Sequence, residues 1–162
     1  MAAYDVRPAR PADAERLGVV HVQAWREAYA TLMPAAHLAG LDAVARGRRW
    51  AELLADGRTV LVGTADDEVV GFATCGPSRD DPPDPALELT AIYLLAVQHG
   101  SDLGRRLLDA ALDGGGAASL WVATGNDRAT AFYAKHGFAP DGQVKAHAAT
   151  GITEERWVRP AG

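Results

Sequence analysis

The sequence predicts a single mixed α/β (α+β) domain over residues 1–162, in which one mixed sheet is covered by helices on both faces. Segments with helical and strand periodicity follow in the order strand, helices, hairpin, long strand, helix, strand, helix, hairpin. A chain of 162 residues suits one core and leaves little for a second domain. No internal repeat is apparent.

The first third of the chain is predicted to be mainly helical. Residues 4–7 form a short opening strand, and Pro11 and Asp13 mark the start of the first helix. Apolar residues of this helix recur every three or four positions and share a face that should meet the sheet: Leu17, Val20, Ala24 and Ala28. Pro34 opens a second helical piece, and residues 43–55 form a further helix.

The middle of the chain predicts a hairpin and a long strand. Residues 58–65 and 68–76 are rich in β-branched side chains and flank the polar turn Asp66-Asp67, so they should pair antiparallel. The stretch SRDDPPDP, residues 78–85, is predicted to be an exposed, mobile loop. Residues 86–97 form the long strand that follows it.

The last third alternates helices and strands. Residues 103–112 predict a helix that a run of glycines ends, and residues 119–123 predict a strand. A helix over residues 126–136 ends at Gly137, and strands over 138–148 and 152–158 flank Thr150-Gly151. This terminal hairpin should carry Trp157 toward the core.

The composition of the chain limits the classes of molecule that it is expected to bind. The formal net charge of −5 argues against a broad nucleic-acid surface, so small molecules or peptides are the expected partners. No apolar run is long enough to span a membrane, the N-terminus lacks a secretory signal, and the cytoplasm is the expected location. The single cysteine, Cys75, is interpreted as core packing, and the five histidines show no metal-binding spacing, so no metal site is expected.

A glycine-bearing turn precedes the helix at residues 103–112. Gly100 and Gly104 bracket this turn, and Arg105 and Arg106 follow in the first helical turn. Free backbone N–H groups and the helix dipole stabilise phosphate at such a position. A tight connection made only for packing has the same pattern. Asp102 lies inside the turn, where an acid would oppose a bound anion.

The segment IYLLAVQHGSDLGRRLL resembles the acetyl-coenzyme A binding motif Q/R-x-x-G-x-G/A of the GNAT superfamily of N-acetyltransferases. Gly104 matches the last glycine, whereas His99 takes the Gln/Arg position and Asp102 takes the place of the preceding glycine. The segment GNDRATAFYAKHGF, residues 125–138, closely resembles the N-x-x-A-x-x-F-Y-x-x-x-G-F segment of the same enzymes. The helical N-terminal region is similar to GNAT sequences as well.

The resemblance implies a mostly antiparallel mixed sheet, splayed between the fourth and fifth strands, with acetyl-coenzyme A in the gap. The diphosphate would bind the amides of residues 99–104, the pantetheine arm would pair with the fourth strand, and a backbone N–H near Leu94 would polarise the thioester carbonyl. The implied coenzyme-binding residues are Leu94, Leu95, Val97, His99, Gly100, Ser101, Asp102, Leu103, Gly104, Arg105, Asn126 and Tyr133.

Asp102 has two interpretations. In the first, it tolerates the unusual backbone geometry that glycine would otherwise supply and caps the helix, with its carboxylate pointing outward. In the second, the carboxylate occupies the anion site and weakens or prevents coenzyme binding.

The resemblance assigns Tyr133 as the acid that protonates the leaving thiolate, since a phenol has a higher pKa than a thiol. Strand alternation places Glu88 on one face with Thr90, Ile92 and Leu94. Glu88 is the candidate base, with a solvated glutamate at the sheet edge as the alternative. Asn126 contacts the coenzyme, caps the following helix, or does both.

His21, Trp25 and Tyr29 recur at four-residue spacing on the first long helix. Trp25 and Tyr29 are candidates for the acceptor pocket, although such a stripe also suits a sheet-facing core.

The function that the resemblance implies is direct transfer of acetyl from acetyl-coenzyme A to a primary amine of a small molecule or peptide. The alternative is a non-catalytic acyl-coenzyme A binding or sensing domain. GNAT proteins are often dimers, so a homodimer is among the expected assemblies.

Overall fold

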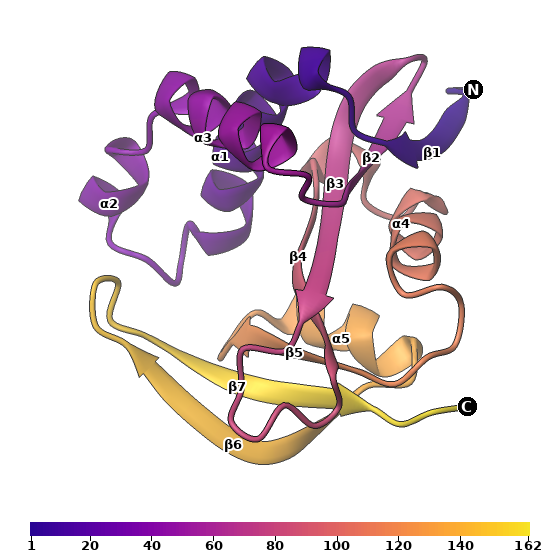
Figure 1. Cartoon of the computed structure of the whole chain (residues 1–162). Coiled ribbons are helices and arrows are strands. Elements are labelled where there is room, and N and C mark those ends of the chain that lie inside the picture. Colours follow the sequence, from indigo (N-terminus) through magenta and orange to yellow (C-terminus); the bar gives the residue numbers. More distant parts are fainter.

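Figure 1 shows the computed structural model, which describes residues 1–162. Its seven strands form one sheet in the order β1-β2-β3-β4-β5-β7-β6. All neighbouring strands are antiparallel except β4 and β5, which are parallel. The strands are β1 Tyr4–Pro8, β2 Val60–Ala65, β3 Glu68–Pro77, β4 Leu87–Leu94, β5 Ala118–Ala123, β6 Ala139–His147 and β7 Ile152–Arg159. The predicted mostly antiparallel mixed sheet is confirmed.

The helices are α1 Ala14–Tyr29, α2 Ala35–Ala39, α3 Ala43–Ala55, α4 Leu103–Ala111 and α5 Asp127–Lys135, with short 3₁₀ turns at Pro11–Asp13 and Ala96–Gln98. The expected long strand over residues 86–97 is shorter than predicted. The strand ends at Leu94, because the chain then folds into the turn in which the N–H of Gln98 donates to the carbonyl of Leu95. None of the helices is both long enough and apolar enough to cross a membrane.

The helices cover both faces of the sheet, as predicted. On one face, Leu17 and Val20 of α1 pack with Trp50 of α3 against the sheet residues Val62 and Phe72. Figure 1 shows α4 on the opposite face from α1 and α3. There α4 buries the leucines that recur along its apolar side, Leu103, Leu107 and Leu108.

The C-terminal part of the sheet has its own core. Trp157 of β7 is buried with Leu120 of β5 and Phe138, which confirms the predicted direction of the terminal hairpin. Cys75 of β3 is half-buried against this cluster, and its thiol donates to the carbonyl of Ala111 at 3.0 Å. Burial raises the pKa of the Cys75 thiol. This environment agrees with the packing role predicted for Cys75.

Gly18 allows α1 and α3 to approach closely. A Cβ atom at residue 18 would lie 2.4 Å from the carbonyl oxygen of Ala43 and 2.5 Å from the amide nitrogen of Gly47. Helix propensity alone predicts that Gly18→Ala stabilises the protein by about 1 kcal/mol. Because backbone atoms cannot move aside cheaply, we expect it instead to lower the free energy of unfolding by about 1–3 kcal/mol. Urea denaturation would measure this difference.

Gly115→Ala is the matched control for Gly18→Ala. A Cβ atom there meets no atom within 4 Å, and the backbone of Gly115 is not in the left-handed region. We expect its unfolding free energy to stay within about 0.5 kcal/mol of the parent. A more stable Gly18→Ala protein would show that the two helices can separate without cost.

The acidic loop at residues 78–85 is tied to the sheet rather than free. The guanidinium of Arg156, which is 5% exposed, donates to Asp80 at 3.0 Å and to Asp141 at 2.6 Å, and it also contacts the carbonyl of Asp84. The indole N–H of Trp121 donates to the other carboxylate oxygen of Asp80 at 2.9 Å. The predicted mobile loop is therefore corrected to an anchored one, because charges far apart in the sequence meet there.

Candidate active site

β4 carries a bulge at Thr90. Ala91 pairs with Thr74 and Leu89 pairs with Cys75 on the adjacent strand, so Thr90 is an extra residue without a partner. An inserted residue reverses which face each preceding side chain points to. The bulge therefore decides the direction of the side chains in the first half of β4.

The bulge corrects the predicted position of Glu88. Ile92 and Leu94 pack toward α4, whereas Glu88 and Tyr93 line one cavity on the side of α1. The prediction that Glu88 shares a face with Ile92 and Leu94 is wrong, because simple alternation does not continue through a bulge.

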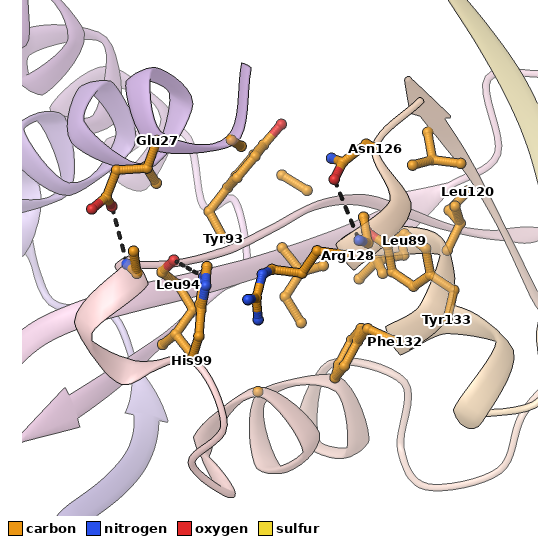
Figure 2. Close-up of a pocket in the computed structure, with 18 of the residues that line it drawn as sticks. Glu27, Leu89, Tyr93, Leu94, His99, Leu120, Asn126, Arg128, Phe132 and Tyr133 are labelled. Atoms are coloured by element: carbon orange, nitrogen blue, oxygen red, sulfur yellow. Dashed lines mark hydrogen bonds between the residues drawn. The ribbon is translucent and has the colours of Figure 1, made fainter. Parts of the chain in front are cut away.

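β4 and β5 pair at one position only, Glu88 with Ser119, and they separate beyond it. This separation confirms the predicted splay of the sheet. A cavity of about 540 Å³ lies in the gap and is bordered by α1, α4 and α5 (Figure 2). It is called the donor cleft after the role proposed for it below. Its lining comprises Ala24, Glu27, Ala28, Tyr29, Leu89, Thr90, Ala91, Ile92, Tyr93, Leu94, Ala96, His99, Gly100, Ser101, Gly104, Leu120, Trp121, Val122, Asn126, Arg128, Ala129, Phe132 and Tyr133.

The structure brings only some of the predicted coenzyme-binding residues to the donor cleft. Those that line it are Leu94, His99, Gly100, Ser101, Gly104, Asn126 and Tyr133. Those that lie outside its lining are Leu95, Val97, Asp102, Leu103 and Arg105. Leu103 is instead fully buried in the core under α4, and Val97 is exposed. The ring of His99 is held by a hydrogen bond of 3.1 Å from its Nε2 to the carbonyl of Leu94.

The loop between β4 and α4 offers free backbone donors. The N–H groups of Gly100, Asp102, Gly104 and Arg105 have no acceptor within the protein. Gly100 has φ +85°, a left-handed conformation that glycine adopts without steric cost. Free amides at the start of a helix attract anions, and the dipole of α4 adds to this effect.

The carboxylate of Asp102 does not occupy these amides. It accepts hydrogen bonds from Nε and Nη2 of Arg105 at 2.7 and 2.8 Å, and its side chain is 58% exposed. The hydrogen bond from Arg105 lowers the pKa of Asp102. The carboxylate thus points outward, as one interpretation expected.

The same interpretation, in which Asp102 replaces a glycine and caps the helix, is wrong in two respects. Asp102 has the ordinary right-handed angles φ −74° and ψ −7°, so it does not replace glycine in a strained backbone. Its side chain also makes no capping hydrogen bond, because Arg105 takes both oxygens. Arg105 in turn bonds to Asp109 at 2.9 Å, so its charge is balanced by two carboxylates outside the cleft.

α5 carries two predicted residues into the donor cleft. Tyr133 is buried, and burial raises the pKa of its phenol well above the ordinary value, so the hydroxyl keeps its proton. Asn126 caps α5, since its side-chain oxygen accepts from the N–H of Ala129 at 3.3 Å, and it also borders the cleft (Figure 2). The two predicted roles of Asn126 are geometrically compatible.

A second cavity of about 290 Å³ adjoins the donor cleft and is called the acceptor cavity after the role proposed for it below. The two cavities share the residues Tyr29, Leu89, Thr90, Tyr93 and Trp121, which surround the bulge. The hydroxyl groups of Tyr29 and Tyr93 lie 2.9 Å apart there. Burial raises the pKa of both phenols, so this pair is neutral. A group bound in one cavity can therefore reach a group bound in the other.

The aromatic stripe of α1 divides between cavity and core. Trp25 and Tyr29 line this second cavity, and their part in an acceptor pocket stays a prediction. His21 lies outside that lining and packs against Trp50 and Phe72. Its Nδ1 accepts from the indole of Trp50 at 3.2 Å, and burial lowers the pKa of His21 to about 4. His21 is therefore a neutral core residue.

Glu88 also lines the acceptor cavity, but its carboxylate is already bound. It is 1% exposed and accepts from the backbone N–H of Arg79 at 3.0 Å and from the Nε of Arg79 at 3.2 Å. The alternative of a solvated glutamate is therefore wrong. Because Arg79 occupies both oxygens, Glu88 holds Arg79 in place instead of standing free to accept a proton.

Sequence reasoning missed several residues of the two cavities. Arg128 lies two residues after Asn126, inside the GNAT-like segment at residues 125–138. That segment could therefore have predicted that Arg128 lies beside the donor cleft. The position of Tyr93 on the same side of the sheet as Glu88 could be predicted only from knowledge of the bulge in β4. Lys145 and Glu154 border the acceptor cavity from the terminal hairpin, a segment with no sequence motif.

A sheet that opens between two parallel strands, with free helix-start amides beside the gap and a proton-bearing tyrosine inside it, defines an acyltransferase architecture. Residues 22–138 match the model of the acetyltransferase (GNAT) family. The chain belongs to this family, as its sequence motifs predicted, and it is an acyltransferase enzyme.

Relatives and solved structures agree with this assignment. An uncharacterized N-acetyltransferase of Mycobacterium tuberculosis is 34% identical over 140 residues, which cover 80% of this chain and 85% of the relative. A GCN5-related N-acetyltransferase from Rhodopseudomonas palustris has the same fold, with a TM-score of 0.73 at 19% identity over 99% of this chain and 97% of the other. YncA of Salmonella typhimurium, solved with acetyl-CoA, gives a TM-score of 0.70 at 18% identity over 98% and 94% of the two chains.

Proposed function

We propose that this enzyme transfers an acetyl group from acetyl-coenzyme A to a primary amine of a small molecule or peptide, by direct attack in a ternary complex. The observation that carries the proposal is the meeting of the two cavities at Tyr29 and Tyr93. A thioester in the donor cleft and an amine in the acceptor cavity would approach each other at the bulge of β4. Holding both reactants in one geometry removes most of the entropy cost of their encounter.

The residues have separate roles in this proposal. The free amides from Gly100 to Arg105 bind the diphosphate, and a backbone N–H of β4 near Leu94 polarises the thioester carbonyl. Tyr133 donates its proton to the leaving thiolate. Glu154 is half-buried in the acceptor cavity and makes no ion pair, so it replaces Glu88 as the carboxylate free to accept the ammonium proton.

Two measurements test the proposal. Acetyl-coenzyme A should raise the melting temperature, since a ligand that binds only the folded state stabilises it by about 2.7 kcal/mol at a hundred times its Kd. Thiol release across a panel of primary amines should then show turnover. A thermal shift without turnover on any amine would support the alternative, a non-catalytic acyl-coenzyme A binding domain. The absence of both would refute coenzyme binding.

Arg128 is the free cation of the donor cleft. Figure 2 shows its side chain extending from the start of α5 into the cleft, toward His99. It makes no ion pair or hydrogen bond within the protein, whereas Arg106 donates to the carbonyl of Tyr4 at 2.8 Å. Arg105 is balanced by Asp102 and Asp109. The positive side chain available to the coenzyme phosphates is therefore Arg128.

Arg128→Gln should weaken binding of coenzyme A about tenfold or more, because a charged hydrogen bond to phosphate contributes about 1.5–3 kcal/mol. Arg105→Gln should change the Kd less than about twofold, in contrast to the prediction from sequence. Calorimetric titration with coenzyme A and 3′-dephospho-coenzyme A would separate a contact with the 3′-phosphate from one with the diphosphate. Equal affinity of Arg128→Gln and the parent for both ligands would remove Arg128 from the site.

A further inference from the structure

We propose that the amine acceptor carries a carboxylate beside its amine, as a small amino acid does, and that Arg79 and Lys145 bind this carboxylate. The inference rests on the proposed acetyl transfer and names the substrate class of the acceptor cavity. It follows from where the charged side chains of this cavity are held and which of their atoms are free.

Arg79 is fixed in position by its surroundings. Its backbone N–H, Nε and Nη2 all donate to Glu88, which is buried beneath it. Buried Arg156 holds the adjacent loop residues Asp80 and Asp84. A guanidinium held in this way loses little conformational freedom when it binds a further group.

The outer edge of Arg79 is available to a ligand. Its Nη1 has no acceptor within the protein, and its side chain is 68% exposed although it borders the acceptor cavity. A guanidinium can bind a second carboxylate through this free edge, with the directed N–H groups that suit carboxylate oxygens.

Lys145 is a second cation that borders the same cavity. Its Nζ lies 4.1 Å from the centre of the Trp121 ring, and no carboxylate lies within ion-pair distance of it. Trp121 is itself held by its hydrogen bond to Asp80, the residue after Arg79. Arg79 and Lys145 thus border the same cavity as Glu154, the cross-strand partner of Lys145, and neither cation forms an ion pair with Glu154. With Arg79 paired to Glu88, the charges of the cavity balance, which suits a ligand that brings one carboxylate and one ammonium group.

The remaining walls suit an amine. Tyr29 and Tyr93 close the cavity at the bulge, where the thioester would lie, and Trp25 adds a third aromatic ring. Aromatic faces attract an ammonium group, and the carboxylate of Glu154 is the acid of this cavity without an ion pair. The cavity of about 290 Å³ lies at the lower end of ligand-pocket volumes, so a small acceptor fits.

A purely cationic amine, such as a polyamine, matches this distribution less well. The charge of Glu88 is already balanced by Arg79. Glu154 would therefore have to balance two positive charges, that of Lys145 and that of the substrate ammonium group. A carboxylated amine brings one charge of each sign, and each charge finds its opposite in the cavity.

Matched acceptor pairs test the inference: alanine against ethylamine, serine against ethanolamine, and valine against isobutylamine. In the parent enzyme we expect kcat/KM to be about tenfold or more higher for at least one carboxylated member over its partner. Arg79→Gln and Lys145→Gln should each reduce this ratio toward one, because the carboxylated member loses a contact that its decarboxylated partner never makes. Arg49→Gln, on the exposed side of α3, is the matched control and should keep the parent ratio.

Arg79→Gln could disturb folding, because Arg79 covers the buried Glu88. Lys145→Gln tests the inference without this risk, because Lys145 is exposed and makes no ion pair. A parent enzyme that prefers the decarboxylated amine in every pair overturns the inference but leaves acetyl transfer standing. Faster reaction of all amines with Arg79→Gln also overturns it, since Arg79 would then be competing with the substrate ammonium for Glu88. If no amine reacts, calorimetry of the same pairs with coenzyme A present decides, and equal heats for both members of each pair refute carboxylate recognition.

Discussion

Replacing Tyr133 with phenylalanine is expected to lower kcat about a hundredfold while the Kd for acetyl-coenzyme A stays within about twofold. When the new C–N bond has formed and the C–S bond breaks, the electron pair leaves on sulfur as a thiolate. In the proposed mechanism Tyr133 gives its proton to this sulfur, and burial, which raises the pKa of its phenol, ensures that the hydroxyl carries that proton beforehand. A hundredfold loss corresponds to about 2.7 kcal/mol of transition-state stabilisation. Thiol-release kinetics and a coenzyme titration on the same preparation would separate the two effects.

Tyr4→Phe is the control for Tyr133→Phe. Its hydroxyl donates to Gln98 at 2.9 Å and lies outside both cavities, so the variant loses a phenol without touching the proposed chemistry. We expect its kcat to match the parent within about twofold. An unchanged kcat in Tyr133→Phe would mean that water or another group protonates the thiolate and that Tyr133 only shapes the cleft.

Arg156→Leu is expected to lower the free energy of unfolding by about 3–5 kcal/mol, the typical cost of breaking a buried ion pair by removing one partner. The substitution leaves the carboxylates of Asp80 and Asp141 facing each other without a cation. It also frees the carbonyl of Asp84, and with it the loop that carries Arg79. For a domain of this size the melting temperature should fall by about 6–20 °C.

The effect of Arg156→Leu should also appear in the acceptor cavity. Because Arg79 would no longer be held from both sides, KM for the acceptor should rise more than the Kd for coenzyme A. Arg49→Leu is the stability control, since the Arg49–Glu52 pair is 57% and 64% exposed and such pairs contribute less than about 1 kcal/mol. Equal melting temperatures for the two variants would show that the Arg156 network is not a structural anchor.

The sequence determined the family, the order of the elements and one half of the donor cleft. The motif after the fifth strand predicted Tyr133 and Asn126 on one helix, and the structure brings both to the cleft. The helix at residues 43–55 was predicted with the bounds that α3 has. These features depend on local periodicity, capping residues and a contiguous motif, and all of that information lies within a few turns of chain.

Only the tertiary structure decided which charged groups meet. Arg105 lies one helical turn after Asp102, a spacing visible in the sequence, but only the structure shows that the carboxylate turns to Arg105 and not to the loop amides. Arg79 and Glu88 are nine residues apart, yet their bond depends on the loop that Arg156 anchors from the last strand. Such partners are chosen by distance in space, which sequence spacing does not encode.

The direction of Glu88 shows the same limit within a single strand. Alternation predicts side-chain direction only while two strands keep their register, and Thr90 interrupts that register against β3. The residue types of β4 contain no mark of the bulge, because a bulge is a property of two paired strands. Sequence therefore determined which chain segment forms the cleft, and the pairing of that segment with its neighbours decided what each side chain does there.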